Sequence, residues 1–257
     1  MQKSMWNKAL KSSTNRITIL LVAIAMMAFV AQQKKVTIWM IGDSTMANKS
    51  KKTFPETGWG MEFGKYFDNT VSIQNKAMNG RSTKSFINEK RWDSVMENLK
   101  EGDYVFIEFG HNDEKIDKPA VGTSIPEFKS NLAKFVLEAR AKGGIPVLLT
   151  PVTRRTFKNG VLTDSHGKYP AATISVADSL HVPMIDLLEK SKKYVISLGD
   201  EPSKQLYNYV DSGNVNYPNG KRDDTHFSQA GASKMAGLAV EGIKELKLDL
   251  AKRLVNK

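Results

Sequence analysis

Short apolar runs rich in β-branched residues alternate with longer stretches of helical spacing, and this alternation constrains the fold more than any other feature. Each short run predicts a strand: Val36–Ile41, Val71–Gln74, Tyr104–Phe109, Ile145–Thr150 and Val182–Leu187. Each longer stretch predicts a helix: Gly60–Phe67, Ser85–Leu99, Ile125–Lys142, Pro170–Leu180 and Ala230–Leu248. Five such units predict an α/β fold, a parallel sheet with helices on both faces.

This topology also predicts where a ligand would bind. Right-handed crossovers place the loops that follow the strands along one edge of a parallel sheet, where ligands normally bind. The sequence contains no internal repeat and no Ser/Gly-rich linker. We therefore predict a single domain over residues 32–257, with its functional site in the loops after the strands.

The first 31 residues differ from the rest of the chain. Residues 1–16 contain four cations and no acid, and Ile17–Ala31 is almost wholly apolar. A basic segment followed by an apolar run shorter than the roughly 20 residues of a membrane span is typical of an export signal. Cleavage after Ala31 would place the bulky Phe29 at the −3 position, so an uncleaved N-terminal anchor stays open as the alternative.

The chain contains no cysteine. This absence excludes thiol nucleophiles and cysteine-based zinc or iron–sulfur sites. Hydrolytic chemistry must then use hydroxyl, imidazole and carboxylate groups. An exported protein without cysteine fits a bacterial periplasm or cell surface better than a eukaryotic secretory route.

Two of the loops after predicted strands offer groups for acyl transfer. Ser44 follows the first strand in the turn Gly42–Thr45, which would lift its hydroxyl to the sheet edge and leave its N–H free. An ordinary helix N-cap or a flavodoxin-like phosphate loop is the alternative. Gly80, in the loop Ala77–Thr83, is placed to present its N–H to a ligand oxygen, and a plain Asn-Gly turn is the alternative.

Two further loops offer an amide donor and a base. Asn112 follows the third strand, where its side chain can reach a developing oxyanion; an Asn/Asp turn is the alternative. His226 comes shortly after two acids in Asp223–Phe227, and one carboxylate can fold back to accept its Nδ1–H, so that Nε2 faces outward as a general base. These acids alternatively cap the final helix or bind a cation. No neighbouring acid in this arrangement accompanies the other histidines, His111, His166 and His181.

Together these loops contain a hydroxyl nucleophile, three oxyanion donors and a base with its orienting acid, which acyl transfer on serine requires. Four segments resemble the four blocks of the SGNH/GDSL hydrolases, and within them the rhamnogalacturonan acetylesterase-type carbohydrate esterases: GDST (Gly42–Thr45), NGRST (Asn79–Thr83), GHND (Gly110–Asp113) and DDTHF (Asp223–Phe227). Supporting stretches are ETGWG (Glu56–Gly60), GRSTKSFI (Gly80–Ile87) and LLTPVTRR (Leu148–Arg155). The resemblance extends from about Val36 to the C-terminus.

This resemblance implies a flavodoxin-like three-layer αβα fold with a five-stranded parallel sheet and no metal or organic cofactor. It implies Ser44 as nucleophile, His226 as base, Asp223 as its orienting acid, and Gly80 and Asn112 as oxyanion donors beside the Ser44 N–H. The implied activity is removal of O-acetyl groups from plant cell-wall polysaccharide through an acetyl-enzyme, with acetylated rhamnogalacturonan as the expected substrate. Acetylxylan is the alternative polymer.

Several other residues are candidates for binding the substrate. Arg81, Arg154 and Arg155 lie in predicted sheet-edge loops, where they can pair with uronate carboxylates or form a solvated charge cluster. Trp59 can stack on a sugar or pack in the core. The insertion Thr153–Tyr169 is long enough to form part of a substrate wall.

The net charge separates the remaining classes of function. Removing the four cations of residues 1–31 from the net charge of +11 leaves +7. No helix-turn-helix, RNP-like or zinc-finger pattern is present, so an acidic polysaccharide is favoured over nucleic acid as the partner. A carbohydrate-binding or flavodoxin-like module would need neither His226 beside Asp223 nor Asn112 after the third strand. A lipid esterase or thioesterase would favour an apolar groove, whereas these loops are rich in Arg, Lys, Asn and Asp.

Overall fold

The computed structural model describes residues 34–255, and the described residues from Val36 onward form one compact unit. A five-stranded sheet runs through it in the order β2-β1-β3-β4-β7, and all of its neighbouring strands are parallel. Its strands are β1 (Val36–Gly42), β2 (Val71–Asn75), β3 (Tyr104–Glu108), β4 (Ile145–Leu149) and β7 (Met184–Ile185). This confirms the predicted parallel α/β sheet. The strand order has its topological switch between β1 and β3, where ligands bind in such sheets.

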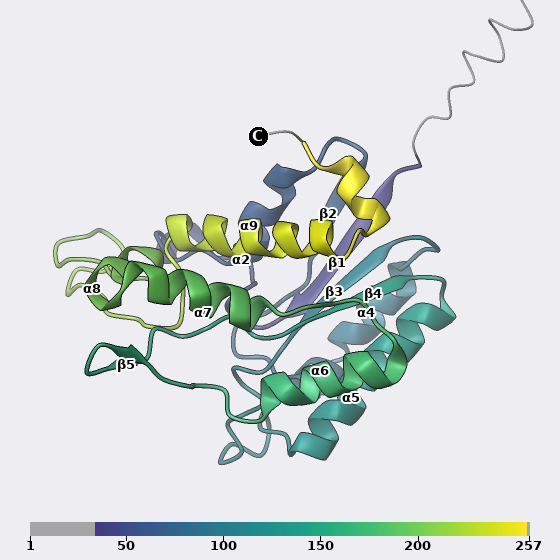
Figure 1. Cartoon of the computed structure of the whole chain (residues 1–257), viewed down its shortest axis with the longest axis horizontal. Helices are drawn as coiled ribbons and strands as arrows, with labels where there is room; N and C mark the ends of the chain where they lie inside the picture. Colours follow the sequence, from purple (N-terminus) through teal and green to yellow (C-terminus); the bar gives the residue numbers. More distant parts are fainter. Residues whose placement is uncertain (1–33, 256–257) are drawn as a thin grey trace, which may run out of the picture. The chain divides into compact units, whose positions relative to one another are not determined.

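Helices cover both faces of the sheet, as Figure 1 shows. One face carries α2 (Trp59–Phe63), α7 (Leu187–Leu198) and α9 (Gln229–Glu245). The other carries α3 (Thr83–Asn88), α4 (Arg91–Asn98), α5 (Ile125–Ala141) and α6 (Tyr169–Leu180). The three-layer αβα arrangement is therefore confirmed.

The side chains of β1 divide the core into two clusters. Ile38 and Met40 pack against the α2, α7 and α9 layer, whereas Trp39 and Ile41 pack against the opposite layer. This division follows from the strand geometry, because successive side chains point to opposite faces of a sheet. A strand that is buried on both faces must be apolar at nearly every position, and β1 is.

The stretch predicted as a single helix over Ser85–Leu99 is two helices. Lys90 separates α3 from α4 and adopts a left-handed backbone conformation with φ of 56°. In one continuous helix Phe86 and Trp92 would lie about 120° apart around the axis. The break allows both of these aromatic side chains to be buried in the same cluster.

The predicted strand Val182–Leu187 is reduced to the two residues of β7. Pro183 has no N–H to donate at its start. At its other end Asp186 caps α7, because its Oδ1 accepts the backbone N–H of Glu189 at 3.1 Å. Leu187 is therefore the first residue of a helix that the sequence analysis did not predict.

The insertion Thr153–Tyr169 contains a short hairpin of β5 (Phe157–Lys158) and β6 (Val161–Leu162). Asn159 and Gly160 form its turn with φ values of 50° and 77°. Positive φ at both central residues is the geometry of a type I′ turn, which favours Asn-Gly.

The predicted export segment, residues 1–31, lies outside the described residues. Within residues 34–255 no helix is long and apolar enough to cross a membrane.

Candidate active site

The four loops identified from the sequence meet at the carboxyl edge of the sheet. Ser44 follows β1, Gly80 follows β2, Asn112 follows β3, and His226 lies just before α9. They border a cavity of about 560 Å³. Its lining residues are Ser44, Glu56, Asn79, Gly80, His111, Asn112, Lys115, Arg154, Lys221, Asp223, Thr225 and His226.

Ser44, His226 and Asp223 form a continuous hydrogen-bonded chain. His226 Nε2 lies 2.9 Å from Ser44 Oγ, and His226 Nδ1 lies 2.9 Å from Asp223 Oδ2. The second Asp223 oxygen accepts the backbone N–H groups of Thr225 and His226 at 2.9 and 3.0 Å. This turn directs the carboxylate back toward the imidazole, in the arrangement that activates a serine hydroxyl.

The hydrogen bonds around Asp223 also determine its charge. Burial alone would raise the pKa of this carboxyl, but the hydrogen bonds from the His226 ring and backbone N–H outweigh burial and hold its pKa well below the usual value. Asp223 is therefore ionised at neutral pH and can stabilise an imidazolium at His226.

The neighbouring Asp224 faces away from the histidine. Its Oδ1 accepts hydrogen bonds from Arg155 Nη1 at 2.7 Å and from the Tyr209 hydroxyl at 2.6 Å. The N-cap of α9 is Ser228, so Asp224 does not cap that helix.

Three residues that line the cavity, Ser44, Gly80 and Asn112, carry N–H donors. Within residues 34–255 the backbone N–H groups of Ser44 and Gly80 have no hydrogen-bond acceptor. Gly80 has φ of 75°, and an added Cβ there would touch nothing, so glycine is required by the backbone conformation. Asn112 donates one Nδ2 hydrogen to Arg81 O at 3.0 Å and its Oδ1 accepts from Lys115 Nζ at 2.7 Å. These two contacts fix the amide and leave its second N–H available.

A buried carboxylate anchors the turn that carries Ser44. Asp43 Oδ1 accepts the backbone N–H and the hydroxyl of Thr45, both at 2.9 Å. Asp43 Oδ2 lies 3.2 Å from His111 Nδ1, which joins the loop after β1 to the loop after β3. Burial lowers the pKa of His111 to about 4, so its ring is neutral at neutral pH.

Glu108, at the end of β3, was not singled out by the sequence analysis. It is fully buried and accepts hydrogen bonds from Trp59 Nε1 at 2.8 Å and Val152 N at 3.1 Å. Burial, reinforced by the nearby Asp43 carboxylate, raises the pKa of Glu108 to about 8. The sequence signal was an acid inside the otherwise apolar strand YVFIEF.

Two predicted substrate contacts do not fit the structure. The Trp59 side chain is fully buried and donates to Glu108, so it packs in the core and cannot stack on a sugar. Arg155 is also buried, its guanidinium pairs with Asp200 and Asp224, and it is absent from the cavity lining, so it does not reach a uronate bound there.

The other two arginines differ in their relation to the cavity. Arg154 lines it, with its guanidinium paired to Glu114 at 2.5 Å and donating to His111 O at 3.3 Å. Arg81 pairs with Glu89 at 3.0 Å and is absent from the cavity lining.

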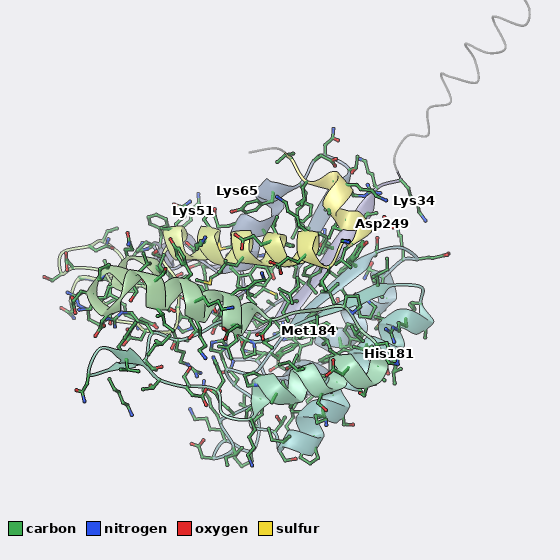
Figure 2. All side chains as sticks on the ribbon, viewed as in Figure 1. Lys34, Lys51, Lys65, His181, Met184 and Asp249 are labelled. Carbon is green, nitrogen blue, oxygen red and sulfur yellow. The ribbon has the colours of Figure 1, made fainter. Side chains whose placement is uncertain are left out.

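The remaining histidines do not all lack acidic partners. His166 Nδ1 lies 3.0 Å from Glu114 Oε2, and its ring packs edge-on against His111 at 4.5 Å between centroids. The acids beside His111 and His166, Asp43 and Glu114, are distant from them in sequence, so local spacing did not reveal these pairs. His181 directly follows α6, has φ of 49° and is exposed (Figure 2).

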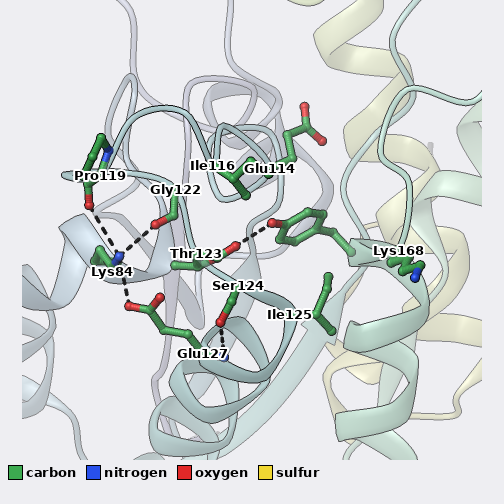
Figure 3. A pocket seen from close by; sticks show the side chains of 11 residues that line it. Lys84, Glu114, Ile116, Pro119, Gly122, Thr123, Ser124, Ile125, Glu127 and Lys168 are labelled. Atoms are coloured by element: carbon green, nitrogen blue, oxygen red, sulfur yellow. Dashed lines mark hydrogen bonds and ion pairs between the residues drawn. The ribbon is translucent and has the colours of Figure 1, made fainter.

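A second cavity, of about 640 Å³, opens beside the N-terminus of α5 (Figure 3). Several of its polar groups are already paired. Lys84 Nζ donates to Gly122 O at 2.8 Å and pairs with Glu127 at 3.1 Å, and the Tyr169 hydroxyl donates to Thr123 O at 2.5 Å. Among the residues that line it, none was predicted to take part in chemistry. The smaller cavity at Ser44 is therefore the candidate active site.

The flavodoxin-like sheet and the serine, histidine and acid at its edge define a class of ester hydrolases. Residues 40–234 match the model of the GDSL-like Lipase/Acylhydrolase family, and the chain belongs to this family. It is 40% identical to rhamnogalacturonan acetylesterase RhgT of Bacillus subtilis over 227 residues, covering 88% of this chain and 97% of the relative. The chain is thus a hydrolase of carboxylic ester bonds.

Solved structures show the same fold. Protein YxiM of Bacillus subtilis superposes with a TM-score of 0.73 at 29% identity, covering 84% of this chain and 58% of that one. Axe2, an acetylxylan esterase from Geobacillus stearothermophilus, superposes with a TM-score of 0.59 at 15% identity, covering 84% of this chain and 96% of that one. At that identity the second likeness concerns the fold alone.

Proposed function

We propose that this protein is a serine acetylesterase that removes O-acetyl groups from an acetylated, uronate-containing polysaccharide of the rhamnogalacturonan type. The observation that carries the proposal is the hydrogen-bonded chain from Ser44 through His226 to Asp223 at the wall of an open cavity. A carbohydrate-binding module has no need of such a chain.

In the proposed acylation step, Ser44 Oγ attacks the acetyl carbonyl carbon while its proton passes to His226 Nε2. The charge that develops on the carbonyl oxygen is stabilised by the N–H groups of Ser44 and Gly80 and by the Asn112 amide. Each such donor contributes about 3 kcal/mol in comparable sites. His226 then gives its proton to the sugar oxygen as the C–O bond breaks, which leaves the acetyl group on Ser44.

Water completes the reaction by the reverse route. His226 takes a proton from the water as its oxygen attacks the acetyl carbonyl carbon, and then returns that proton to Ser44 as acetate leaves. Throughout, Asp223 holds the imidazole by its Nδ1–H and stabilises its positive form.

The substrate class is supported by the charge of the site and by the relative's name. Three cations, Lys115, Arg154 and Lys221, and two carboxylates, Glu56 and Asp223, line the cavity, which leaves an excess of positive charge, and the chain outside residues 1–31 carries +7. A field of this sign attracts polyanions. The 40% identical relative is named a rhamnogalacturonan acetylesterase. Of the arginines considered, Arg154 is the one that we retain as a substrate contact.

Export belongs to the same proposal and is supported by the basic and then apolar pattern of residues 1–31. A polysaccharide substrate would be met outside the cytoplasm. Mass determination of the N-terminus in the cell fraction that contains the protein separates a cleaved signal from a retained anchor, and recovery from the cytoplasm alone would contradict export.

Release of acetate from acetylated rhamnogalacturonan, acetylxylan and acetylated chitin fragments, each at low and high salt, tests the substrate. Attraction between charges is screened over about 8–10 Å at ordinary ionic strength. Added salt should therefore raise KM for rhamnogalacturonan and leave turnover of a small neutral acetate ester unchanged. Equal use of neutral acetylxylan at both salt levels, without preference for rhamnogalacturonan, would reject the polyanion and leave the acetylesterase mechanism standing.

A pair of arginine variants localises the effect. Arg154→Met should raise KM for the acidic polymer, because Arg154 lines the cavity. Arg81→Met, which removes a charge outside the cavity lining, serves as the control and should leave KM unchanged.

A further inference from the structure

Arg155 lies behind the loop that carries Asp223 and His226. Its side chain is only 6% exposed, although it bears a permanent charge. The guanidinium is shared between two carboxylates, with Nη1 at 2.7 Å from Asp224 Oδ1 and Nη2 paired with Asp200 Oδ1. Removing one partner of a buried ion pair is strongly destabilising, because the other charge is left buried and unpaired. The positions of Arg155 and its two carboxylate partners are therefore tightly fixed.

Arg155 holds Asp224 at both main chain and side chain. Its backbone N–H donates to Asp224 O at 2.8 Å, and its Nη1 donates to Asp224 Oδ1. Tyr209 closes the cluster, because its hydroxyl donates to the same Oδ1 at 2.6 Å and accepts from Arg155 Nη1 at 3.1 Å.

The rest of this loop is anchored only at its ends. On one side the backbone of Lys221 pairs with Val210, and on the other side Asn208 N donates to His226 O at 2.8 Å. Between these anchors, within the part of the chain that the structure describes, Asp224 is the residue of 223–225 whose hydrogen bonds and ion pairs reach beyond this loop. Asp223 itself bonds only to groups of its own loop.

We propose that Arg155 is a positioning residue for the proposed catalytic loop. By holding Asp224 from behind, it keeps the Asp223 carboxylate in register with His226, and His226 in register with Ser44. The inference rests on the proposed function, since it concerns the same histidine. It also links the insertion to the site, because Arg155 immediately precedes the β5–β6 hairpin region.

Two half-exposed carboxylates on the same guanidinium provide a matched pair of variants. The side chains of Asp224 and Asp200 are 46% and 40% exposed. Asp224→Asn loosens the loop, whereas Asp200→Asn removes a similar ion pair and leaves the loop untouched. Arg155→Met removes the hold altogether, and Arg155→Lys keeps the charge without the forked geometry.

The measurement is the rate at which a fluorophosphonate probe labels Ser44, because it needs the histidine base and no particular substrate. We expect Arg155→Met to lower this rate about tenfold, since small displacements in a reacting pair are costly. Asp224→Asn should lower the labelling rate severalfold. The rate for Arg155→Lys should lie between those for wild type and Arg155→Met, and the rate for Asp200→Asn should stay within twofold of wild type.

The pH profile of labelling distinguishes positioning from a through-space charge effect. The acid limb of the profile is the low-pH range in which labelling falls because His226 is protonated. Loss of the positive charge of Arg155 would by itself favour protonation of His226 and so move the acid limb to higher pH. Displacement of Asp223 from His226 instead makes the protonated imidazole less stable and moves the acid limb to lower pH, which is the result that we expect. The other charged or titratable groups facing His226 across the cavity stay the same in every variant, namely Glu56, His111, Lys115, Arg154 and Lys221.

Labelling of Arg155→Met at the wild-type rate with an unmoved acid limb would overturn the proposal and leave Arg155 a structural residue. If that variant fails to fold, the comparison of Asp224→Asn with Asp200→Asn decides, and equal rates reject the proposal. Failure of the wild-type protein to be labelled would instead reject Ser44 as the nucleophile, so the two failures are distinguishable.

Discussion

Ser44 is the residue on which the proposed chemistry depends most directly. Its Oγ lies 2.9 Å from His226 Nε2 and is the only group of the chain that the proposed mechanism acylates. We expect Ser44→Ala to reduce esterase activity at least about a thousandfold. Thermal unfolding should be close to wild type, because only one partly exposed oxygen atom is removed. Ordinary turnover in a preparation free of other esterases would contradict this assignment.

The two adjacent acids should differ in their contributions. Asp223→Asn removes the carboxylate that fixes the histidine tautomer, a change that costs about four orders of magnitude in comparable triads. Asp224→Asn should cost far less, because Asp224 bonds to Arg155 and Tyr209 and not to the histidine. Comparison of kcat for the two variants on one acetate ester checks this. Equal losses, or a larger loss at Asp224, would overturn the pairing.

At the residue scale the sequence located the loops correctly and assigned some side chains wrongly. Ser44 and His226 could be proposed from the sequence because a turn at the end of a strand and a histidine shortly after two acids are local features. The choice of Asp223 over Asp224 came from the resemblance to the SGNH/GDSL hydrolases. For Trp59 the alternative of core packing was correct, and for Arg155 neither a uronate contact nor a solvated cluster was, because whether a loop side chain points to solvent or to the core depends on packing with distant segments. The partners Glu114 and Asp200 lie dozens of residues away from the side chains they bind.

Among the elements, α5 offers a clean test of local stability. Ser124 caps it, with Oγ accepting the backbone N–H of Glu127 at 3.3 Å. Ser124→Ala should reduce the free energy of unfolding by about 1 kcal/mol, whereas Ser124→Gly should cost only a few tenths. For a chain of this size the alanine variant should lower Tm by roughly 2–4 °C, measurable by calorimetry. An alanine variant as stable as the glycine variant would show that the cap contributes nothing.

The predicted elements were most accurate where periodicity was long and unbroken. The helix predicted over Ile125–Lys142 is observed over Ile125–Ala141, because its apolar pattern is long and two glycines, Gly143 and Gly144, follow it directly. No glycine or proline at Lys90 indicates a helix break in the sequence. The break arises from the burial of two aromatic side chains, Phe86 and Trp92, in one cluster. The helix α7 was missed because its first residue looks like the end of a strand.

For the whole molecule, the alternation of strands and helices was enough to predict a parallel sheet covered on both faces. It did not predict that a fully buried acid lies in the core. Glu108 has an unusually high pKa, about 8, because of burial and the neighbouring Asp43. Unfolded, the same group titrates near its ordinary value. Stability from this group is therefore present at acidic pH and is lost as pH rises toward about 8.

The consequence is measurable as the slope of stability against pH. The pKa of His111 is about 4 in the folded protein and near 6.5 in the unfolded chain, so this residue makes stability rise with pH, but only below about pH 6.5. Asp113 has a pKa of about 7. Between pH 7 and 8 the decline should therefore come mainly from Glu108. Glu108→Gln should lower the free energy of unfolding overall, because the N–H groups of Trp59 and Val152 donate to different carboxyl oxygens and a glutamine amide would turn its NH2 group toward one of them. The substitution should also flatten this decline in urea titrations. An unchanged slope would contradict a neutral Glu108.

The Ser44–His226 contact joins residues 182 positions apart in the chain. At ribosomal rates of about 5–20 residues per second, the nucleophile is synthesised on the order of ten to forty seconds before its base. Throughout that interval the growing polypeptide holds a serine with ordinary alcohol reactivity. A polypeptide that terminates before His226 would therefore lack the base of the proposed mechanism and should have no esterase activity.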